Sequence, residues 1–262
     1  MKTTNIFFAL ALMAAAMVFA SCSKDDDVNN VPSQKEIETK IIGKWKATKR
    51  DNEDVITNRR SILTYKVDNI GTASHAGMID GGVYIWDNQS PFTYSISGNK
   101  IHEIPDEGTT MRERVSVVAN ISESTLTFED KSPMDSKISL FFSTKVTADY
   151  TNDIIGMWEG VEMTGYETYG NAEARIEYRA DGTYTYYNKE GDYWVPSANV
   201  DNEYNVDGDW LATRWRPEAG ADYNYEWWDI DEIKDGTMKW SALREKEDGT
   251  RFTTTFTWKK VK

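Results

Sequence analysis

The pentapeptide Ile41-Ile42-Gly43-Lys44-Trp45 returns 113 residues later as Ile154-Ile155-Gly156-Met157-Trp158. The matches continue in the same order along the chain. They pair residues 63–72 with 176–183, 93–99 with 203–209, and 121–128 with 233–240. A repeat of this length indicates that one structural module is built twice.

Alternating apolar and polar residues predict that both copies consist of β-strands. In the second copy, Ala174, Ile176 and Tyr178 alternate with charged residues, and residues 252–259 alternate in the same way. This period of two is typical of half-buried strands. Four Asp-Gly pairs predict tight turns, because glycine tolerates positive φ: Asp181-Gly182, Asp207-Gly208, Asp235-Gly236 and Asp248-Gly249. We therefore predict an all-β fold, an antiparallel meander that closes into a barrel or sandwich.

Two local exceptions interrupt this pattern. Residues 36–42 are helical in character, with Ser33 as a candidate N-cap. The adjacent residues Trp227 and Trp228 break the alternation around them, which is what a β-bulge would do. We predict a short helix before the first strand and a bulge at the paired tryptophans.

The N-terminus predicts export. Lys2 precedes an apolar run from Ile6 to Phe19, which is short for a bilayer span and gives way to polar residues. These features are typical of a cleaved secretory signal. We assign residues 1–21 to the signal peptide and residues 22–35, which are acidic and poor in apolar groups, to a flexible tether.

Phe19-Ala20-Ser21-Cys22 resembles the lipobox of bacterial lipoproteins, which implies lipid attachment at Cys22 and anchoring to a membrane. The following Ser23 to Asp27 stretch resembles the surface-export signal of Bacteroidetes lipoproteins. That resemblance implies an outer-membrane location, facing outward. A plain secretory signal and a solvated acidic tether are the alternatives. Cys22 is the only cysteine, so lipidation would leave none for a disulfide or a thiolate site.

A Gly-x-Trp motif followed by an antiparallel meander resembles the lipocalin-like domains of Bacteroidetes lipoproteins. The resemblance implies two tandem barrels of about eight strands, over residues 36–148 and 149–262, each able to hold one small ligand at its mouth. The second copy is the closer match to the pattern. By the same resemblance, Gly43 with Trp45 and Gly156 with Trp158 have structural roles at the closed end of each barrel.

Composition argues against several classes of function. The formal net charge is −13, and there is no basic stripe, so nucleic-acid binding is not expected. His75 and His102 are the only histidines, and we expect both to be solvated surface residues. The acidic pairs around Asp207-Asp209 and Asp229-Asp231-Glu232 are interpreted as products of a chain rich in carboxylates. We expect no enzymatic activity, no metal and no cofactor.

Aromatic residues distinguish the copies, because eight of the ten tryptophans fall in the second. Flat rings beside hydrogen-bonding groups suit a sugar ring or an apolar small molecule. The candidate ligand-binding residues are Trp194, Trp210, Trp215, Trp227, Trp228 and Tyr225. The alternative is that these rings only fill the barrel.

We therefore expect a surface-anchored, non-enzymatic lipoprotein whose second barrel binds a small apolar molecule or a glycan. The alternative is a structural lipoprotein that docks on another envelope protein. A hydrolase that uses a carboxylate pair is the third hypothesis.

Overall fold

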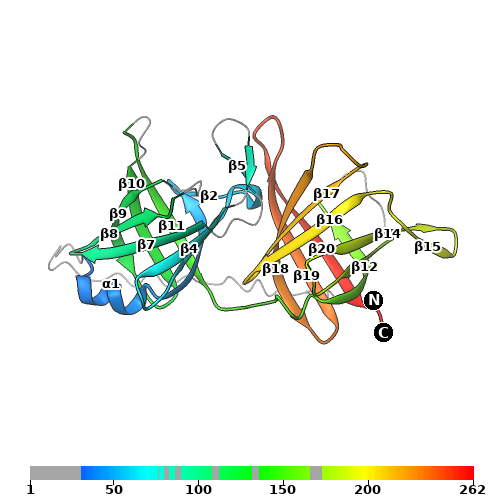
Figure 1. The fold of residues 1–262 in the computed structure, drawn as a ribbon, viewed down its shortest axis with the longest axis horizontal. Coiled ribbons are helices and arrows are strands. Elements are labelled where there is room, and N and C mark those ends of the chain that lie inside the picture. The colour runs from blue at the N-terminus through cyan, green and yellow to red at the C-terminus, as the bar shows by residue number, and fades with distance from the viewer. Residues whose placement is uncertain are drawn as a thin grey trace, which may run out of the picture. The chain divides into compact units, whose positions relative to one another are not determined.

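The structure, a computed structural model, describes residues 31–75, 77–79, 83–85, 90–107, 112–131, 136–165 and 173–262 (Figure 1). The predicted signal peptide, Cys22 and most of the predicted tether lie outside these residues, as does Trp86. Almost every described element is a strand, and the strands form two large antiparallel sheets. The all-β prediction is confirmed.

The first sheet is a closed barrel. Its order is β11-β10-β9-β8-β7-β4-β3-β1-β2, and β1 also pairs with β11, so eight strands close on themselves and β2 is appended at the edge. The strands are β1 (Gly43–Arg50), β2 (Glu53–Asp54), β3 (Ser61–Tyr65), β4 (Ile70–His75), β7 (Ser90–Ser97), β8 (Lys100–Pro105), β9 (Arg114–Ile121), β10 (Thr125–Lys131) and β11 (Ile138–Val146). A 3-10 helix, η1 (Thr57–Arg59), and a separate hairpin, β5 (Gly77–Ile79) with β6 (Val83–Ile85), complete this half.

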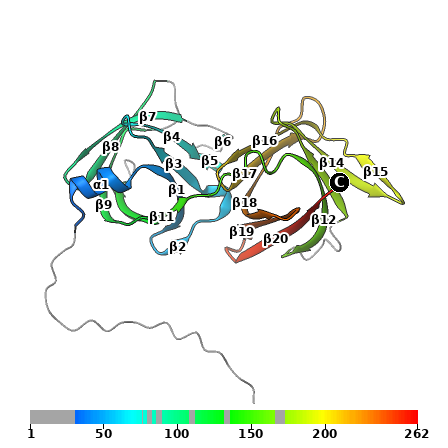
Figure 2. The same ribbon diagram turned by 90° about the horizontal axis from the view of Figure 1, so that it is seen from below.

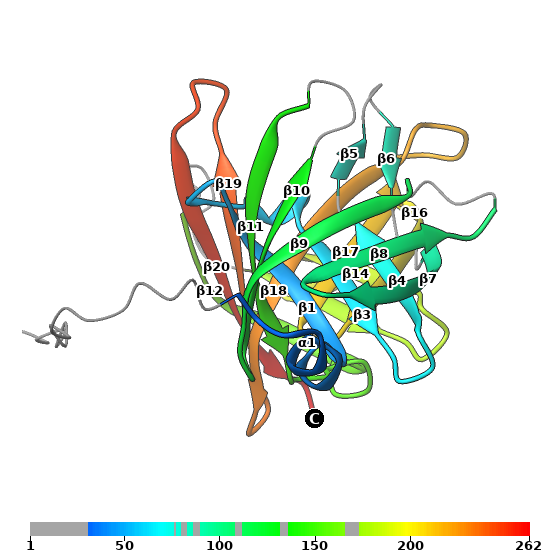
Figure 3. The ribbon, with the colours of Figure 1, turned by 90° about the vertical axis from the view of Figure 1, so that its left-hand side faces the viewer.

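A short helix, α1 (Gln34–Lys40), precedes the first barrel and lies across one end of it (Figure 3). Ser33 is its N-cap, because the Ser33 side chain accepts a hydrogen bond from the Glu36 N–H. Ile37 and the C-cap residue Ile41 are fully buried in the barrel core. The helix and its cap were predicted correctly, although α1 begins two residues earlier than expected and takes Gln34 and Lys35 from the predicted tether.

The second sheet is curled but does not close by regular pairing (Figure 2). Its order is β15-β14-β13-β12-β20-β19-β18-β17-β16. The strands are β12 (Gly156–Thr164), β13 (Ala174–Tyr178), β14 (Tyr184–Glu190), β15 (Tyr193–Pro196), β16 (Val200–Asp207), β17 (Trp210–Arg216), β18 (Asn224–Lys234), β19 (Thr237–Glu245) and β20 (Arg251–Lys260).

The expectation of a second closed barrel needs correction at one seam. In the first barrel, β4 pairs directly with β7 over residues 70–73 and 90–93. In the second, the corresponding strands β14 and β16 meet only at an isolated bridge between Thr183 and Glu203. Residues 187–190 of β14 pair instead with β15. Because β15 takes that edge of β14, the regular ladder to β16 cannot form there.

The repeated Gly-x-Trp motif adopts one conformation in both copies. Gly43 and Gly156 have φ of 131° and 126°, which glycine adopts at least cost. Trp45 Nε1 donates to the Ile41 carbonyl oxygen at 2.6 Å, and Trp158 Nε1 donates to that of Ile154 at 2.7 Å. Both indoles are fully buried. A lysine near the end of each copy also lies over the indole. Lys145 Nζ is 5.1 Å from the ring centroid of Trp45, and Lys260 Nζ is 4.9 Å from that of Trp158.

A buried tyrosine pair also recurs. Tyr94 Oη donates to the Lys66 carbonyl oxygen, and Tyr204 Oη donates to that of Arg179, both at 2.6 Å. Each of these rings meets a second tyrosine edge-on, Tyr65 in the first copy and Tyr178 in the second, with centroids 5.1 and 4.7 Å apart. Since the same contacts hold both halves, the sequence repeat is a structural repeat.

The predicted bulge at Trp227 and Trp228 is wrong. From Asn224 to Asp229, β18 pairs with β17 in unbroken register, and the register shift lies further on, between Ile230 and Glu232. Trp228 faces the core of the second barrel, whereas Trp227 belongs to a separate cluster with Ile62 of β3. Alternation fails here because both faces of β18 are covered, one by its own barrel and one by the first barrel.

Candidate functional site

The second barrel forms a partly open cavity of about 400 Å³. This volume lies within the range of small-molecule sites, about 300–1,000 Å³. Aromatic rings make most of its wall. The lining residues are Met163, Ile176, Tyr178, Tyr184, Tyr186, Asn199, Thr213, Trp215, Glu226, Trp228, Trp240, Phe256 and Trp258. They come from β12, β13, β14, β17, β18, β19 and β20 together with the segment before β16, which makes this the interior of the curled sheet.

The corresponding interior of the first barrel carries a charged group of its own. Glu103 is fully buried, and Arg114, opposite it in the β8–β9 register, donates to it from Nε at 2.6 Å. The hydroxyl of Tyr65 also donates to Glu103. Burial and the neighbouring Glu103 carboxylate raise the pKa of Tyr65 well above its usual value. Glu103 therefore accepts hydrogen bonds from both Tyr65 and Arg114.

The second barrel replaces that group at the matching positions. In the β17–β18 register, Thr213 lies opposite Glu226, where the first copy has Glu103 opposite Arg114. The tyrosine is retained as Tyr178, but its buried hydroxyl has no hydrogen-bond partner among the described residues. A buried polar group left unpaired is costly, by about 1–3 kcal/mol. The hydroxyl of Tyr178 is therefore an unsatisfied donor on the wall of the cavity.

Glu226 brings a carboxyl group to the same wall. Its side chain is 32% exposed, and Arg244 Nη2 lies 3.1 Å from its Oε1. The Arg244 guanidinium also stacks on Trp228, with Cζ 4.7 Å from the ring centroid. Burial raises the pKa of Glu226, while Arg244 and a hydrogen bond from Trp228 act in the opposite direction. The cavity wall thus combines aromatic rings with the carboxyl group of Glu226, which is paired with Arg244.

The six aromatic residues singled out from the sequence lie in three different places. Trp215 and Trp228 line the cavity. Trp210 and Trp227 are buried with Ile62 between the two barrels, and Tyr225 packs against that cluster. Trp194 lies on β15, with the Arg175 guanidinium 4.5 Å from its ring centroid. The structure therefore brings only two of the six to the cavity.

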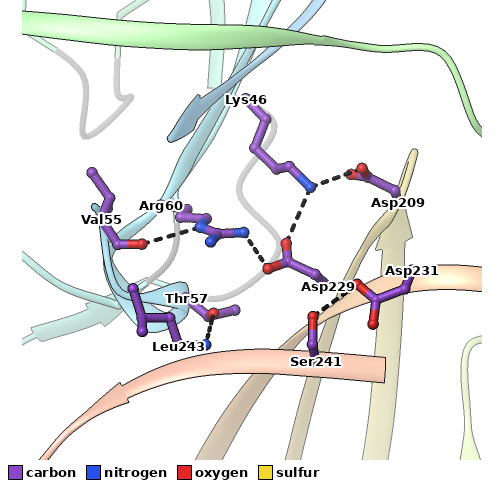
Figure 4. Close-up of polar contacts among 9 residues, drawn as sticks. All are labelled: Lys46, Val55, Thr57, Arg60, Asp209, Asp229, Asp231, Ser241 and Leu243. Atoms are coloured by element: carbon purple, nitrogen blue, oxygen red, sulfur yellow. Dashed lines mark hydrogen bonds and ion pairs between the residues drawn. The ribbon is translucent and has the colours of Figure 1, made fainter. Parts of the chain in front are cut away.

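Ion pairs hold the two barrels against each other (Figure 4). Lys46 Nζ of β1 lies 2.8 Å from Asp209 and 3.1 Å from Asp229, and Arg60 donates to the second oxygen of Asp229. Asp207 receives Lys44 Nζ at 2.6 Å. These aspartates were noted in the sequence as chance neighbours. Instead, Asp207, Asp209 and Asp229 each contact a cation of the first barrel, a partnership that only the tertiary structure shows.

Of the two histidines, only His102 has a described side chain, and its ion-pair partner is Glu113. His102 Nε2 lies 2.6 Å from Glu113 at an exposed position, and the side chain of His75 falls outside the description. Within the described ranges, no group of three His, Cys, Asp or Glu side chains is arranged to hold a metal ion. No described helix has the length and apolar character to cross a membrane.

Sequence reasoning missed most of the cavity wall. Tyr178, Tyr184, Thr213 and Trp240 were not proposed as ligand contacts, although all four line the cavity. Inward-facing positions in alternating strands were the available signal. Alternation cannot tell a filled interior from an open one, however, because both need inward aromatic residues.

Residues 41–128 match the family model described as a lipocalin-like domain. The match lies in the first copy, although the sequence pattern had suggested that the second was closer. The fold of the chain is lipocalin-like. No curated protein matches this chain.

Two solved structures resemble the chain weakly. One is a double mutant of the vaccine antigen transferrin binding protein B from Haemophilus parasuis, with 10% identity over 83% of this chain and a TM-score of 0.25. The chain spans 59% of that protein's length. The other is a DUF3598-family protein of unknown function from Nostoc punctiforme, with 12% identity, 88% coverage of this chain, 100% of that chain and a TM-score of 0.24. Scores this low carry no conclusion about function.

Proposed function

We propose that the second barrel binds one small, largely apolar molecule in its interior cavity. The observation that carries this proposal is the exchange of a hydrogen-bonded Tyr65–Glu103–Arg114 group in the first barrel for a cavity in the second, where the buried Tyr178 hydroxyl has no partner among the described residues. A ligand with a hydrogen-bond acceptor would satisfy the Tyr178 hydroxyl. Its apolar body would pack against rings such as Trp228, Trp240 and Trp258, which favours binding by removing apolar surface from water.

We further propose that the chain is a lipoprotein held at the outer surface of a bacterial outer membrane through Cys22, and that it acts by binding without catalysis. The support is the lipobox-like stretch before Cys22 and the acidic residues after it. Metabolic labelling with a fatty-acid analogue should mark the protein, and Cys22→Ser should abolish the label. Persistent labelling of Cys22→Ser would contradict the anchor.

Titration of the full chain with a panel of uncharged aromatic and aliphatic molecules, with 2-methoxynaphthalene as the reference probe, tests the cavity. We expect a single saturable site, followed by quenching of tryptophan fluorescence. Thr213 is buried and lines the cavity, so Thr213→Phe should fill the space and abolish binding.

The matched control is Thr144→Phe, the same change at an exposed position of β11 in the first barrel. It should leave binding unchanged, and circular dichroism should show that both variants are folded. Absence of saturable binding across the panel, or full binding by Thr213→Phe, would contradict the proposal. Docking on an envelope protein partner would then become the better hypothesis.

A further inference from the structure

A second pocket, of about 350 Å³, opens beside the cavity and includes a residue of the first barrel. Its lining residues are Asn58, Trp215, Tyr223, Asn224, Tyr225, Trp227 and Arg244. Asn58 belongs to η1 of the first barrel, and the other residues belong to β17, β18, β19 or the segment just before β18. We call this pocket the vestibule.

The vestibule and the cavity share a wall. Trp215 lines both spaces. Arg244 lines the vestibule and, through Nη2, pairs with Glu226 of the cavity at 3.1 Å. Trp215 and the Arg244–Glu226 pair therefore lie where the two spaces adjoin.

Two polar atoms of the vestibule need complementary partners. The Oδ1 atom of Asn58 is a buried acceptor, and the Nε atom of Arg244 is a buried donor; neither has a hydrogen-bond partner among the residues described. A hydroxyl group can donate to the first and accept from the second, because it has one donor and two acceptor sites. An apolar group would satisfy neither atom.

Contacts between the barrels hold Asn58 at this place. On one side of it, the Thr57 hydroxyl oxygen accepts a hydrogen bond from the Leu243 N–H at 2.8 Å (Figure 4). Two residues further along, Arg60 binds Asp229 of β18. The first barrel is thus held on both sides of Asn58, a residue that lines the vestibule.

From this geometry we propose that the vestibule binds a hydroxyl-bearing head group of the ligand, so that the ligand class is an apolar body joined to an alcohol or sugar. The proposal rests on the proposed function, because the apolar body occupies the cavity. It gives the first barrel a direct part in ligand selection, through Asn58. The tandem arrangement then builds a composite site that neither barrel has alone.

Two matched probes distinguish binding of the head group from binding of the apolar body. The first, 2-naphthyl β-D-glucopyranoside, carries a hydroxylated head group, and the second, 2-methoxynaphthalene, lacks it. Both are titrated into the full chain, its Asn58→Ala variant and a control, Asn120→Ala, at an exposed position of β9. We expect Asn58→Ala to weaken glucoside binding by about tenfold, the effect of one lost hydrogen bond. Methoxynaphthalene binding to Asn58→Ala, and both affinities of Asn120→Ala, should stay unchanged.

Each other outcome is decisive. If methoxynaphthalene binds but Asn58→Ala leaves glucoside affinity unchanged, the head-group inference is overturned while the cavity proposal stands. If Asn58→Ala weakens the binding of both probes equally, the head-group inference is also overturned. The substitution would then act through the contact between the two barrels and not through the head group. If neither probe binds the unaltered chain, both proposals fail.

Discussion

The two barrels share a frame but differ in what fills it. Both bury the tryptophan of Gly-x-Trp against the same carbonyl four residues earlier, and both keep the edge-on tyrosine pair. Inside the first, Glu103 accepts hydrogen bonds from Arg114 and Tyr65. Inside the second, Thr213 and Glu226 stand at those positions, and a cavity opens beside Tyr178. Two copies with the same buried tryptophan and tyrosine contacts can therefore differ in the buried polar groups of their interiors.

The largest expected effect tests the shared frame. Trp45→Ala and Trp158→Ala each remove a fully buried indole and its hydrogen bond. Each should lower the free energy of unfolding of its own barrel by about 3–5 kcal/mol, measured by urea denaturation followed by circular dichroism. Tyr193→Ala, at a position 77% exposed, should change stability by no more than about 0.5 kcal/mol. A small loss in one barrel only would mean that the frames are not equivalent.

A smaller effect tests the contrast in the interiors. Tyr65→Phe removes the hydroxyl that donates to buried Glu103 and should cost about 1.5–3 kcal/mol, the range for a hydrogen bond to a charged group. Tyr178→Phe removes a buried hydroxyl with no partner among the described residues, so it should raise the free energy of unfolding, by up to about 1–3 kcal/mol. Thermal and urea unfolding of the two variants provide the measurement. Equal losses would show that the Tyr178 hydroxyl is satisfied after all.

The smallest effect is a dependence on pH. Burial raises the pKa of Glu226 above its ordinary value of 4.5, so the folded chain keeps this proton at pH values where the unfolded chain has released it. The Glu226 contribution to the free energy of unfolding therefore falls as pH rises from 4.5 through the folded pKa. Glu226→Gln cannot titrate, and its stability relative to the unaltered chain should rise over that window in urea denaturation. Parallel curves for the two proteins would contradict the raised pKa.

Local patterning predicted the frame well. Alternation identified β13 and β20, the Asp-Gly pairs fell at turns between strands, and Ser33 caps α1. These features depend on neighbours within a few residues, so the sequence displays them directly. The misassigned bulge at Trp227 and Trp228 shows the limit of this logic. Two adjacent buried rings suggested an irregular strand, whereas a second barrel covers the outer face of β18.

The candidate site was less accessible to sequence reasoning. Trp210 and Trp227 were proposed for ligand binding, and both pack with Ile62 of the first barrel, although Trp227 also lines the vestibule. Asp209 and Asp229 were dismissed, yet they receive Lys46 from 163 and 183 residues away. Nothing near these residues in the chain indicates such partners, because the contacts form only when the two barrels meet.

By itself, the sequence determined that this chain is a duplicated all-β module with Gly-x-Trp at the start of each copy, because strand periodicity, turns and repeats are local properties. The tertiary structure was needed to show that the second sheet curls around a cavity, that the Tyr178 hydroxyl has no partner in the described part of the chain, and that Asn58 of the first barrel lines the neighbouring vestibule. Those facts depend on which side chains meet across strands and between barrels, and on whether the space they enclose is filled.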